Sequence, residues 1–327
     1  NHKLLAKIFI AIQEIEVKNF EDEIEGFLDL VKEIWDVSED FDWLIELLLV
    51  HSTELITKSN LQGSKIDAQL KYVHGTVVSE RLKWYRASVV LLESAFQNAT
   101  QHEEWTIAND KLCVLISYQL SDSLTKLSRQ VRKDEGNTDG ALKLSRRSLQ
   151  VLRKYSNESS MNYEIDAEFE HAVNHFENNT FKNALHHYKH ALALAEAAKF
   201  KEKVCEILVK IGECYKRYFY FKVILILVTK FIFSLEDFQN FENYLFLAIE
   251  VAGELKLSEF EGDINVSLGQ FFIQVNNFEK TSSYLKAAIQ CFMTAKNPNK
   301  MTYAKSILAE VKGKSQKYFQ KKKLIVI

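Results

Sequence analysis

The stretch AVNHFENNTFKNALHHYKHA, residues 172–191, alternates small and aromatic side chains at fixed intervals. These positions are Ala172, Phe181, Ala184, Tyr188 and Ala191. A second copy, GQFFIQVNNFEKTSSYLKAA at 269–288, places matching residues at Gly269, Phe278, Thr281, Leu285 and Ala288. Small residues suit the point where two helices cross closely, and the aromatic residue fills the turn between them. Each stretch therefore predicts a helical hairpin.

The spacing of these hairpins is regular except at one place. Ala172 and Gly212 are 40 residues apart, and so are Ala248 and Ala288. From Ala191 to Ala248 the distance is 57 residues, which is 40 plus 17. A fixed period of this length is the signature of stacked repeats. The sequence predicts an all-α, right-handed solenoid of about five to seven helical hairpins, an architecture that usually provides a binding surface.

Composition agrees with long helices joined by short turns. The 327 residues are 47% hydrophobic, with 42 basic and 44 acidic side chains, and include one proline and ten glycines. A formal net charge of −2 gives no basic footprint for nucleic acid or an anionic membrane. Four scattered cysteines indicate reduced, mostly buried thiols. The chain begins at Asn1, which suggests a fragment, and its first residues lack a secretion signal.

The first part of the chain predicts less regular hairpins. Apolar spacing predicts a hairpin over 3–36, with a turn near Asn19, and then a helix over about 42–58 capped by Ser38 and Asp40. Helix 65–80 is expected to open a hairpin with Gly75 at the small position. Matching offsets from Gly75 fall at Trp84, Ala87 and Leu91. Beyond it we expect one long helix over 105–133, a charged loop over 133–140 and a helix over 139–155.

These patterns divide the chain into three parts. Residues 1–158 form irregular helical hairpins, residues 159–312 form three 40-residue repeats, and residues 313–327 form a basic and apolar tail. The repeats are interrupted by YFYFKVILILVTKFIFS, residues 218–234, which is apolar on every face.

Three interpretations of the segment 218–234 stay open. It is short for a membrane helix, which needs about 20 residues, and it contains two lysines. It could be a native buried extension of the hairpin. We favour translated intron sequence, because 17 codons keep the frame, the residues are those of AT-rich codons, and removal restores the 40-residue period. The tail shares this character, so neither segment is used for a functional argument.

The small–aromatic–small–aromatic–small ladder resembles tetratricopeptide repeats of a long-period variety. Within that superfamily the chain also resembles an axonemal family of motile cilia and sperm flagella, that of tetratricopeptide repeat protein 29. This second resemblance rests on FED at 20–22, SED at 38–40 before Trp43, Gly75, Trp105, and the step Leu120–Asp122. It covers roughly residues 4–310. The 17-residue excess departs from it, as does the absence of that family's terminal extensions.

No pattern of catalytic or metal-binding residues is specific. His171 and His175 form one i,i+4 pair, and His186 and His190 form another. Two facing pairs could bind zinc, but no HExxH motif completes them, so ordinary core and surface imidazoles are favoured. Cys205 and Cys214 lie too far apart on one helix to form a disulfide. With no nucleotide-binding or nucleophile motif, we expect a protein that is not an enzyme and has no cofactor.

In tetratricopeptide hairpins the first helix of each pair lines the concave groove. Counted from the ladder, the candidate groove residues are Phe169, Val173, Phe176, Glu177, Val209, Glu213, Lys216, Arg217, Val266, Gln270, Ile273 and Gln274. They mix apolar groups with charges of both signs and lack the basic array that clamps a peptide carboxylate. This mixture suits an amphipathic helix or an extended segment.

The sequence therefore predicts a scaffold that binds other proteins. The axonemal resemblance implies a cytoplasmic, cytoskeletal protein of the cilium or flagellum, with axonemal, transport or dynein-associated partners and a role in motility. We expect no nucleic-acid or membrane partner. The alternatives are a general cytosolic tetratricopeptide adaptor and a regulatory solenoid that belongs to a larger enzyme.

Overall fold

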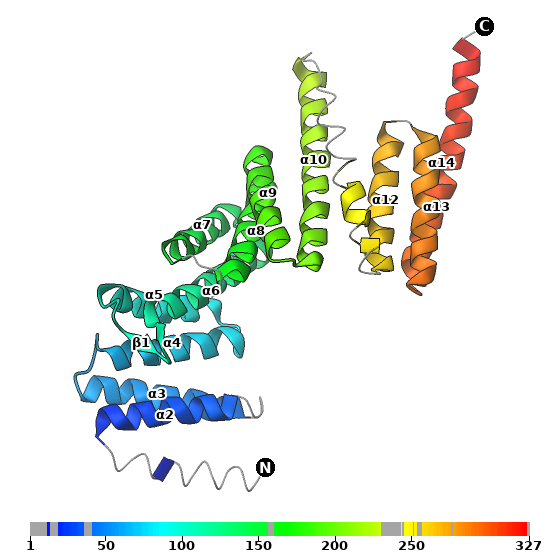
Figure 1. Ribbon diagram of the computed structural model, residues 1–327. Helices are drawn as coiled ribbons and strands as arrows, with labels where there is room; N and C mark the ends of the chain where they lie inside the picture. Colours follow the sequence, from blue (N-terminus) through cyan, green and yellow to red (C-terminus); the bar gives the residue numbers. More distant parts are fainter. Residues whose placement is uncertain are drawn as a thin grey trace. The chain divides into compact units, whose positions relative to one another are not determined.

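A computed structural model describes most of the chain. The described residues are 12–13, 19–35, 41–155, 160–229, 243, 245–250, 252–253, 257–275 and 277–325, without the side chains of 216, 219–229 and 314–325. This part is almost entirely helical, and the helices follow one another as hairpins (Figure 1). The chain divides into two compact units, residues 1–174 and 175–327, and the division falls within helix α8. The three-part division expected from the sequence stays a prediction.

The first unit contains three helical hairpins and most of α8. Its helices are α2 (Phe20–Trp35), α3 (Asp42–Lys58), α4 (Lys65–Glu80), α5 (Tyr85–Gln101), α6 (Leu112–Asp134), α7 (Thr138–Lys154) and α8 (Met161–Glu177). Helix α2 packs against α3 and α4, and α4 in turn packs against α5 and α6. Each of α2, α4 and α6 is thus the first helix of a hairpin and contacts the first helix of the next.

The predicted helices 42–58 and 65–80 are confirmed as α3 and α4. Helix α2 corresponds to the second helix of the hairpin predicted over 3–36, and it packs against α3. Of the predicted first helix, Ile12 and Gln13 are the described residues. The expected caps Ser38 and Asp40 lie outside the described residues.

The long helix predicted over 105–133 is wrong at its start. Two short antiparallel strands, β1 (Thr106–Ile107) and β2 (Asp110–Lys111), precede α6. The two residues between them, Ala108 and Asn109, have φ of 48° and 75°, as a tight two-residue turn requires. Helix α6 also continues through Asp134, so the loop expected over 133–140 is shorter, and the Asn137 side chain accepts a hydrogen bond from the Gly140 amide to cap α7.

The predicted register of the α4–α5 hairpin is wrong by one residue. A side chain at Gly75 would meet Leu92 rather than Leu91, with the nearest carbon 2.6 Å away. Ser88, one position after the predicted Ala87, contacts Gly75, and its hydroxyl donates to the Gly75 carbonyl at 2.8 Å. Trp84 immediately precedes α5, its side chain makes no capping hydrogen bond, and it is 59% exposed. The turn before α5 is one residue longer than in the regular repeats, and Lys83 enters the left-handed region with φ of 58°.

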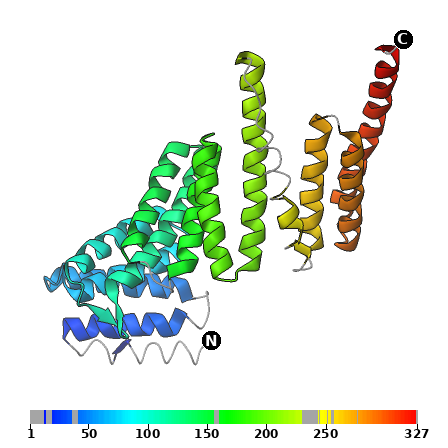
Figure 2. The same cartoon turned by 45° about the horizontal axis from the view of Figure 1, so that its top comes forward.

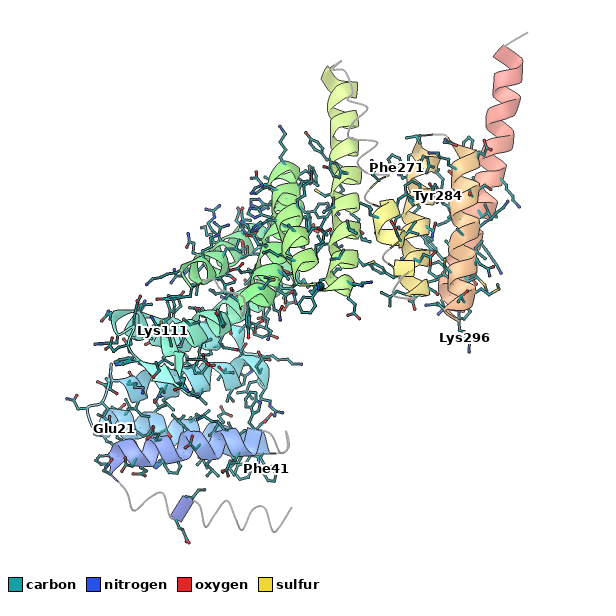
Figure 3. The ribbon with its side chains drawn as sticks, in the orientation of Figure 1. Glu21, Phe41, Lys111, Phe271, Tyr284 and Lys296 are labelled. Carbon is teal, nitrogen blue, oxygen red and sulfur yellow. The ribbon has the colours of Figure 1, made fainter. Side chains whose placement is uncertain are left out.

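The second unit contains the regular repeats (Figure 2). Its helices are the last turn of α8, then α9 (Phe181–Ala197), α10 (Lys201–Thr229), α12 (Ser258–Gln274), α13 (Phe278–Thr294) and α14 (Pro298–Ile325), with helical residues also at 245–250. The residues expected at the crossings, Ala191, Ala248 and Ala288, are all 0% exposed, which confirms their predicted position. Phe271 of α12 and Tyr284 of α13 mark the last such hairpin in Figure 3.

The ladder resumes after the 17-residue excess. A side chain on Gly269 would meet Leu285, which lies 16 positions later, and one on Gly212 would meet Leu245, which lies 33 positions later. The difference between these two spacings is 17 residues. Helix α10 is 29 residues long, against 17 for α8, α9, α12 and α13, so the extra residues begin within it. In the part of the chain that the structure describes, no helix combines the length and apolar character that membrane crossing needs.

Candidate protein-binding groove

In the first unit, a hollow of about 330 Å³ lies between α2 and α4, the first helices of two consecutive hairpins. It is lined by Val31, Lys32, Trp35, Tyr72, Val73, Thr76 and Val77. The Arg81 guanidinium lies 4.7 Å from the centre of the Trp35 ring and donates to the Trp35 carbonyl at 2.8 Å. These contacts fix the end of α2 and hold the indole at the edge of the hollow. The hollow thus offers an apolar, partly aromatic site beside cationic side chains.

Aromatic side chains continue along the first helices of this unit. Tyr118 of α6 stacks on Tyr163 of α8, with ring centres 5.3 Å apart. Burial raises the pKa of Tyr72, and the neighbouring Tyr163 adds to the rise. Burial also raises the pKa of Tyr163. These phenols therefore stay neutral at physiological pH, and they present flat surfaces with a polar tip.

Glu80 of α4 forms an ion-pair cluster with Asp122 and Lys126 of α6. The Lys126 ammonium is 2.7 Å from Glu80 and 2.8 Å from Asp122. Burial raises the pKa of Asp122, and the negative charge of Glu80 also raises it. Burial acts in the same direction on Glu80, but the hydrogen bond and charge of Lys126 outweigh it and lower its pKa. Lys126 is thus shared between two carboxylates, and the charged form is favoured at Glu80 but disfavoured at Asp122.

In the second unit, a comparable hollow of about 320 Å³ lies between α10 and α12. It is lined by Glu206, Val209, Lys210, Glu213, Leu245, Phe260, Asp263, Ile264 and Ser267. The floor is apolar, and three carboxylates face one ammonium group among the lining residues. Lys210 pairs with Glu213 at 2.8 Å, while Lys300 of α14 pairs with Asp263 at 2.6 Å. Lys203 also pairs with Glu206 at 3.3 Å, so each of the three carboxylates has a lysine partner. The hollow therefore combines an apolar floor with a rim of paired acidic and basic side chains.

Several predicted groove residues meet in the second unit. The Arg217 guanidinium lies 4.4 Å from the centre of the Phe176 ring and 3.7 Å from the Glu177 carboxylate. Val209 and Glu213 both line the hollow between α10 and α12. The Gln270 amide donates to the Tyr303 hydroxyl of α14 at 3.0 Å. The structure thus places these residues on the surface formed by first helices, although in separate groups.

Several predicted groove residues, Phe176 among them, are largely buried or stand apart. Phe169, Phe176 and Val266 are 6–8% exposed, so a partner could contact little more than their edges. Val173 and Ile273 are half-buried, Gln274 is exposed, and the Lys216 side chain lies outside the described part.

The sequence reasoning missed Trp35 and Tyr72, because it searched for the groove in the regular repeats alone. A signal was available, since aromatic residues recur on the expected first helices of the irregular part.

The buried carboxylates of α8 are paired rather than poised for chemistry. Glu170, 1% exposed, accepts hydrogen bonds from Arg132 at 2.7 Å and Arg129 at 3.2 Å. Glu168, 2% exposed, accepts one from Arg153 at 3.3 Å. Truncating one partner of such a pair would leave an uncompensated buried charge, so a structural role accounts for these residues.

The cysteines behave as the sequence predicts. All four are free thiols, three are buried, and Cys291 is half-buried. Burial raises the pKa of Cys205 and Cys291 to about 11 and that of Cys214 to about 12. The reactive thiolate is therefore scarce at neutral pH.

Comparison with protein-family models and with curated proteins finds no match. Solved structures do match. A signal-transduction ATPase (STAND) protein with a tetratricopeptide repeat sensor from Pyrococcus horikoshii is 16% identical, with a TM-score of 0.52 over 95% of this chain and 47% of that one. Aspartyl phosphate phosphatase F from Bacillus subtilis is 12% identical, with a TM-score of 0.52 over 97% and 83%.

This chain therefore spans about half the length of the first of these proteins. At such identities the likeness shows the fold alone. The chain has the all-α, tetratricopeptide-like architecture of stacked helical hairpins that its 40-residue period predicts.

Proposed function

We propose that this protein is a non-enzymatic scaffold that holds other proteins on the surface formed by its first helices. One observation carries the proposal: each unit has a hollow of similar size, and both lie between the first helices of consecutive hairpins. A repeat that leaves a similar space between first helices provides, in each unit, a pocket for an apolar side chain of a bound segment.

The two hollows favour different side chains. Between α10 and α12 the apolar floor and the rim of carboxylates paired with lysines suit an amphipathic segment with apolar anchors and charged flanks. Between α2 and α4 the half-buried Trp35 and the apolar lining suit an apolar or aromatic anchor, since Lys32 and Arg81 already pair with Asp29 and Asp42.

For the biological setting we propose the axoneme of motile cilia or flagella, with axonemal, transport or dynein-associated partners. The support is the resemblance carried by the FED, SED, Trp43 and Trp105 elements and the three-repeat block. FED begins α2, where the Asn19 side chain accepts a hydrogen bond from the Asp22 amide at 3.0 Å. A general cytosolic adaptor is the alternative if this setting fails.

The binding test uses charge reversal at the rim of the α10–α12 hollow. The variant Glu206→Lys/Glu213→Lys should lose capture of a basic amphipathic partner from a ciliated-cell extract, because like charges now meet across the interface. Glu202→Lys, on an exposed position of the same helix, is the matched control and should keep it. Equal capture by both variants, with helicity preserved, would remove this hollow from the binding site.

The setting is tested separately by locating the tagged full-length protein in ciliated cells and by removing the gene. We expect staining along motile cilia and impaired beating, with other cell functions spared. Diffuse staining together with normal beating would reject the axonemal setting and leave the general adaptor.

A second candidate function has one observation in its favour. Almost the whole chain matches a sensor-containing protein of which it spans less than half. The chain could thus be the regulatory solenoid of a larger enzyme. The full-length reading frame decides this, because a catalytic domain would be visible in it.

A further inference from the structure

Aromatic side chains form a connected series on the first helices of the first unit. Trp35 of α2 and Tyr72 of α4 line the same hollow. The Tyr72 phenol lies near that of Tyr163 of α8, which adds to the rise of its pKa. Tyr163 in turn stacks on Tyr118 of α6, with ring centres 5.3 Å apart and ring planes 16° apart. These four residues, the aromatic row, therefore join four successive first helices within residues 1–174.

The aromatic row is both accessible and firmly held. Trp35, Tyr72 and Tyr163 are half-buried, so part of each side chain is open to a partner. Tyr118 is 9% exposed and chiefly supports the Tyr163 ring. The Arg81 guanidinium lies 4.7 Å from the centre of the Trp35 ring and fixes the indole. Aromatic side chains that are already ordered lose little conformational entropy when a partner binds.

The ion-pair cluster of α4 and α6 lies beside Tyr163. The charges of Glu80, Asp122 and Lys126 all act on the Tyr163 phenol. Two carboxylates share one ammonium group, so the cluster has a net charge of −1. The side chains of Glu80 and Asp122 are 38% and 24% exposed. A cation on a bound segment can therefore form a charge-assisted hydrogen bond with the cluster at this end of the row.

The spacing of the first helices matches one kind of extended segment. Helix α2 packs on α4, and α4 packs on α6. The axes of packed helices lie about 8–10 Å apart. A polyproline II segment repeats every three residues, about 9.3 Å, whereas a β-strand repeats every two residues, about 6.7 Å. A polyproline II segment that crosses these helices therefore turns the same side of its chain to each, and a β-strand falls out of step.

We propose that the aromatic row binds a proline-rich segment in the polyproline II conformation, with an arginine that pairs with the Glu80–Asp122 cluster. This inference rests on the proposed function and names the class of segment that the first unit holds. Proline rings pack on aromatic rings, and the segment is ordered before it binds. Its backbone carbonyls have no internal hydrogen bonds, so the hydroxyls of Tyr72 and Tyr163 can donate to them. The carbonyls of an α-helix are already paired within the helix.

The test is fluorescence anisotropy of the full chain with a labelled peptide of ten prolines followed by two arginines. We expect saturable binding of one peptide per chain. A peptide with alternating glycine and serine in place of the prolines, but with both arginines, should bind at least tenfold more weakly. A helical leucine–lysine peptide of the same net charge represents the rival occupant and should bind more weakly than the proline peptide. These comparisons need no variant of the protein.

Variants of the protein then locate the peptide. Tyr72→Ala and Tyr163→Ala should each weaken binding at least tenfold, because interface energy is concentrated in aromatic anchors. Trp43→Ala, at a position 58% exposed on the second helix α3, is the matched control and should bind as the parent does. Asp122→Asn should weaken binding of the arginine peptide but not of a peptide with glutamine in place of both arginines. A general loss of folding would weaken both, and circular dichroism verifies the helices.

Equal affinity for the proline and glycine–serine peptides would overturn the inference, because charge alone would then explain binding. Unchanged affinity in both tyrosine variants would do the same. Preferred binding of the leucine–lysine helix, lost in Tyr72→Ala, would also overturn it while leaving the scaffold function in place. The scaffold function itself would fail only if the capture experiment at the α10–α12 hollow found no partner either.

Discussion

In the first unit α6 and α7 cross through hydroxyl groups, whereas in the second unit α12 and α13 cross through apolar side chains. Between α6 and α7, Ser148 Oγ lies 2.6 Å from Ser121 Oγ and 3.0 Å from Thr125 Oγ1, and all three residues are buried. Between α12 and α13, the crossing is made by Gly269, Leu285 and Ala288, the last two 0% exposed. Small size is required in both places, and serine meets the requirement only when its hydroxyl has a partner.

The hydroxyl contacts extend over several hairpins of the first unit. Ser123 Oγ of α6 lies 3.0 Å from Ser88 Oγ of α5 and 3.0 Å from Ser79 Oγ of α4. Asn174 of α8 reaches Ser128 of α6 at 2.8 Å. A serine network specifies one arrangement through directed bonds, whereas the apolar ladder specifies it through shape. The two units should therefore respond differently to the same kind of substitution.

The largest effect is expected from overfilling the apolar ladder. Ala288→Leu adds three carbons at a position with no free space, and it should lower the free energy of unfolding by about 1–3 kcal/mol. Ala287→Leu, on the exposed neighbouring position, is the matched control and should change it by less than about 0.5 kcal/mol. Urea unfolding measures both. Similar stability of the two variants would show that the register is wrong.

A smaller effect is expected in the serine network. Ser148→Ala removes a partner from Ser121 and Thr125, and we expect a loss of about 1 kcal/mol. The double variant Ser121→Ala/Ser148→Ala should lose less than the sum of the single variants, because no hydroxyl of that pair is left without its partner. Strict additivity in the urea-unfolding cycle would contradict this account. Ser283→Ala, exposed on α13, serves as the control.

Much of the fold follows from the sequence where one repeat resembles the next. The ladder predicted the buried positions Ala191, Ala248 and Ala288, and apolar spacing predicted α3 and α4. The register of α5 failed because the turn before it has four residues, 81–84, against three between α8 and α9, and none of the four is a glycine or proline that would signal the change. The β1–β2 hairpin was missed for the same reason, since Ala108 and Asn109 are a weak turn signal.

The candidate sites were less predictable, because they depend on contacts between helices. An i,i+4 search finds histidines on one helix and cannot tell that His187, rather than His186 or His190, stacks on His175. Trp35 and Tyr72 lie 37 positions apart and share a hollow only because α2 and α4 are adjacent first helices. Side-chain direction across a helical interface is fixed by the register, which the irregular hairpins do not reveal in their sequence.

The shared lysine of the first unit predicts opposite effects for two similar substitutions. The lowered pKa of Glu80 means that its charge stabilises the fold above the ordinary carboxyl pKa and that this contribution is lost as pH falls. The raised pKa of Asp122 means that its charged form, present at neutral pH, costs stability.

At neutral pH we therefore expect Glu80→Gln to destabilise the protein by about 0.2–1 kcal/mol, the range of exposed ion pairs. Asp122→Asn should leave the stability unchanged or raise it slightly. Near pH 4 both differences should shrink, as the carboxyl groups of the parent protein become protonated. Urea unfolding at the two pH values checks this, and a larger loss from Asp122→Asn would reverse the assignment.

The smallest effect is expected from the largest change, removal of residues 218–234. Without them α10 would comprise residues 201–217, which is 17 residues, the length of α8, α9, α12 and α13. Three residues would then precede Phe238, as three precede Phe278 after α12. Leu245 would follow Gly212 by 16 positions, as Leu285 follows Gly269.

We therefore expect a soluble, helical protein with an equal or higher Tm. A native buried extension would instead leave a cavity that costs several kcal/mol, roughly 2–5 for each large apolar side chain removed. Aggregation or loss of helicity in the deletion variant, measured by light scattering and circular dichroism, would show that the segment belongs to the fold.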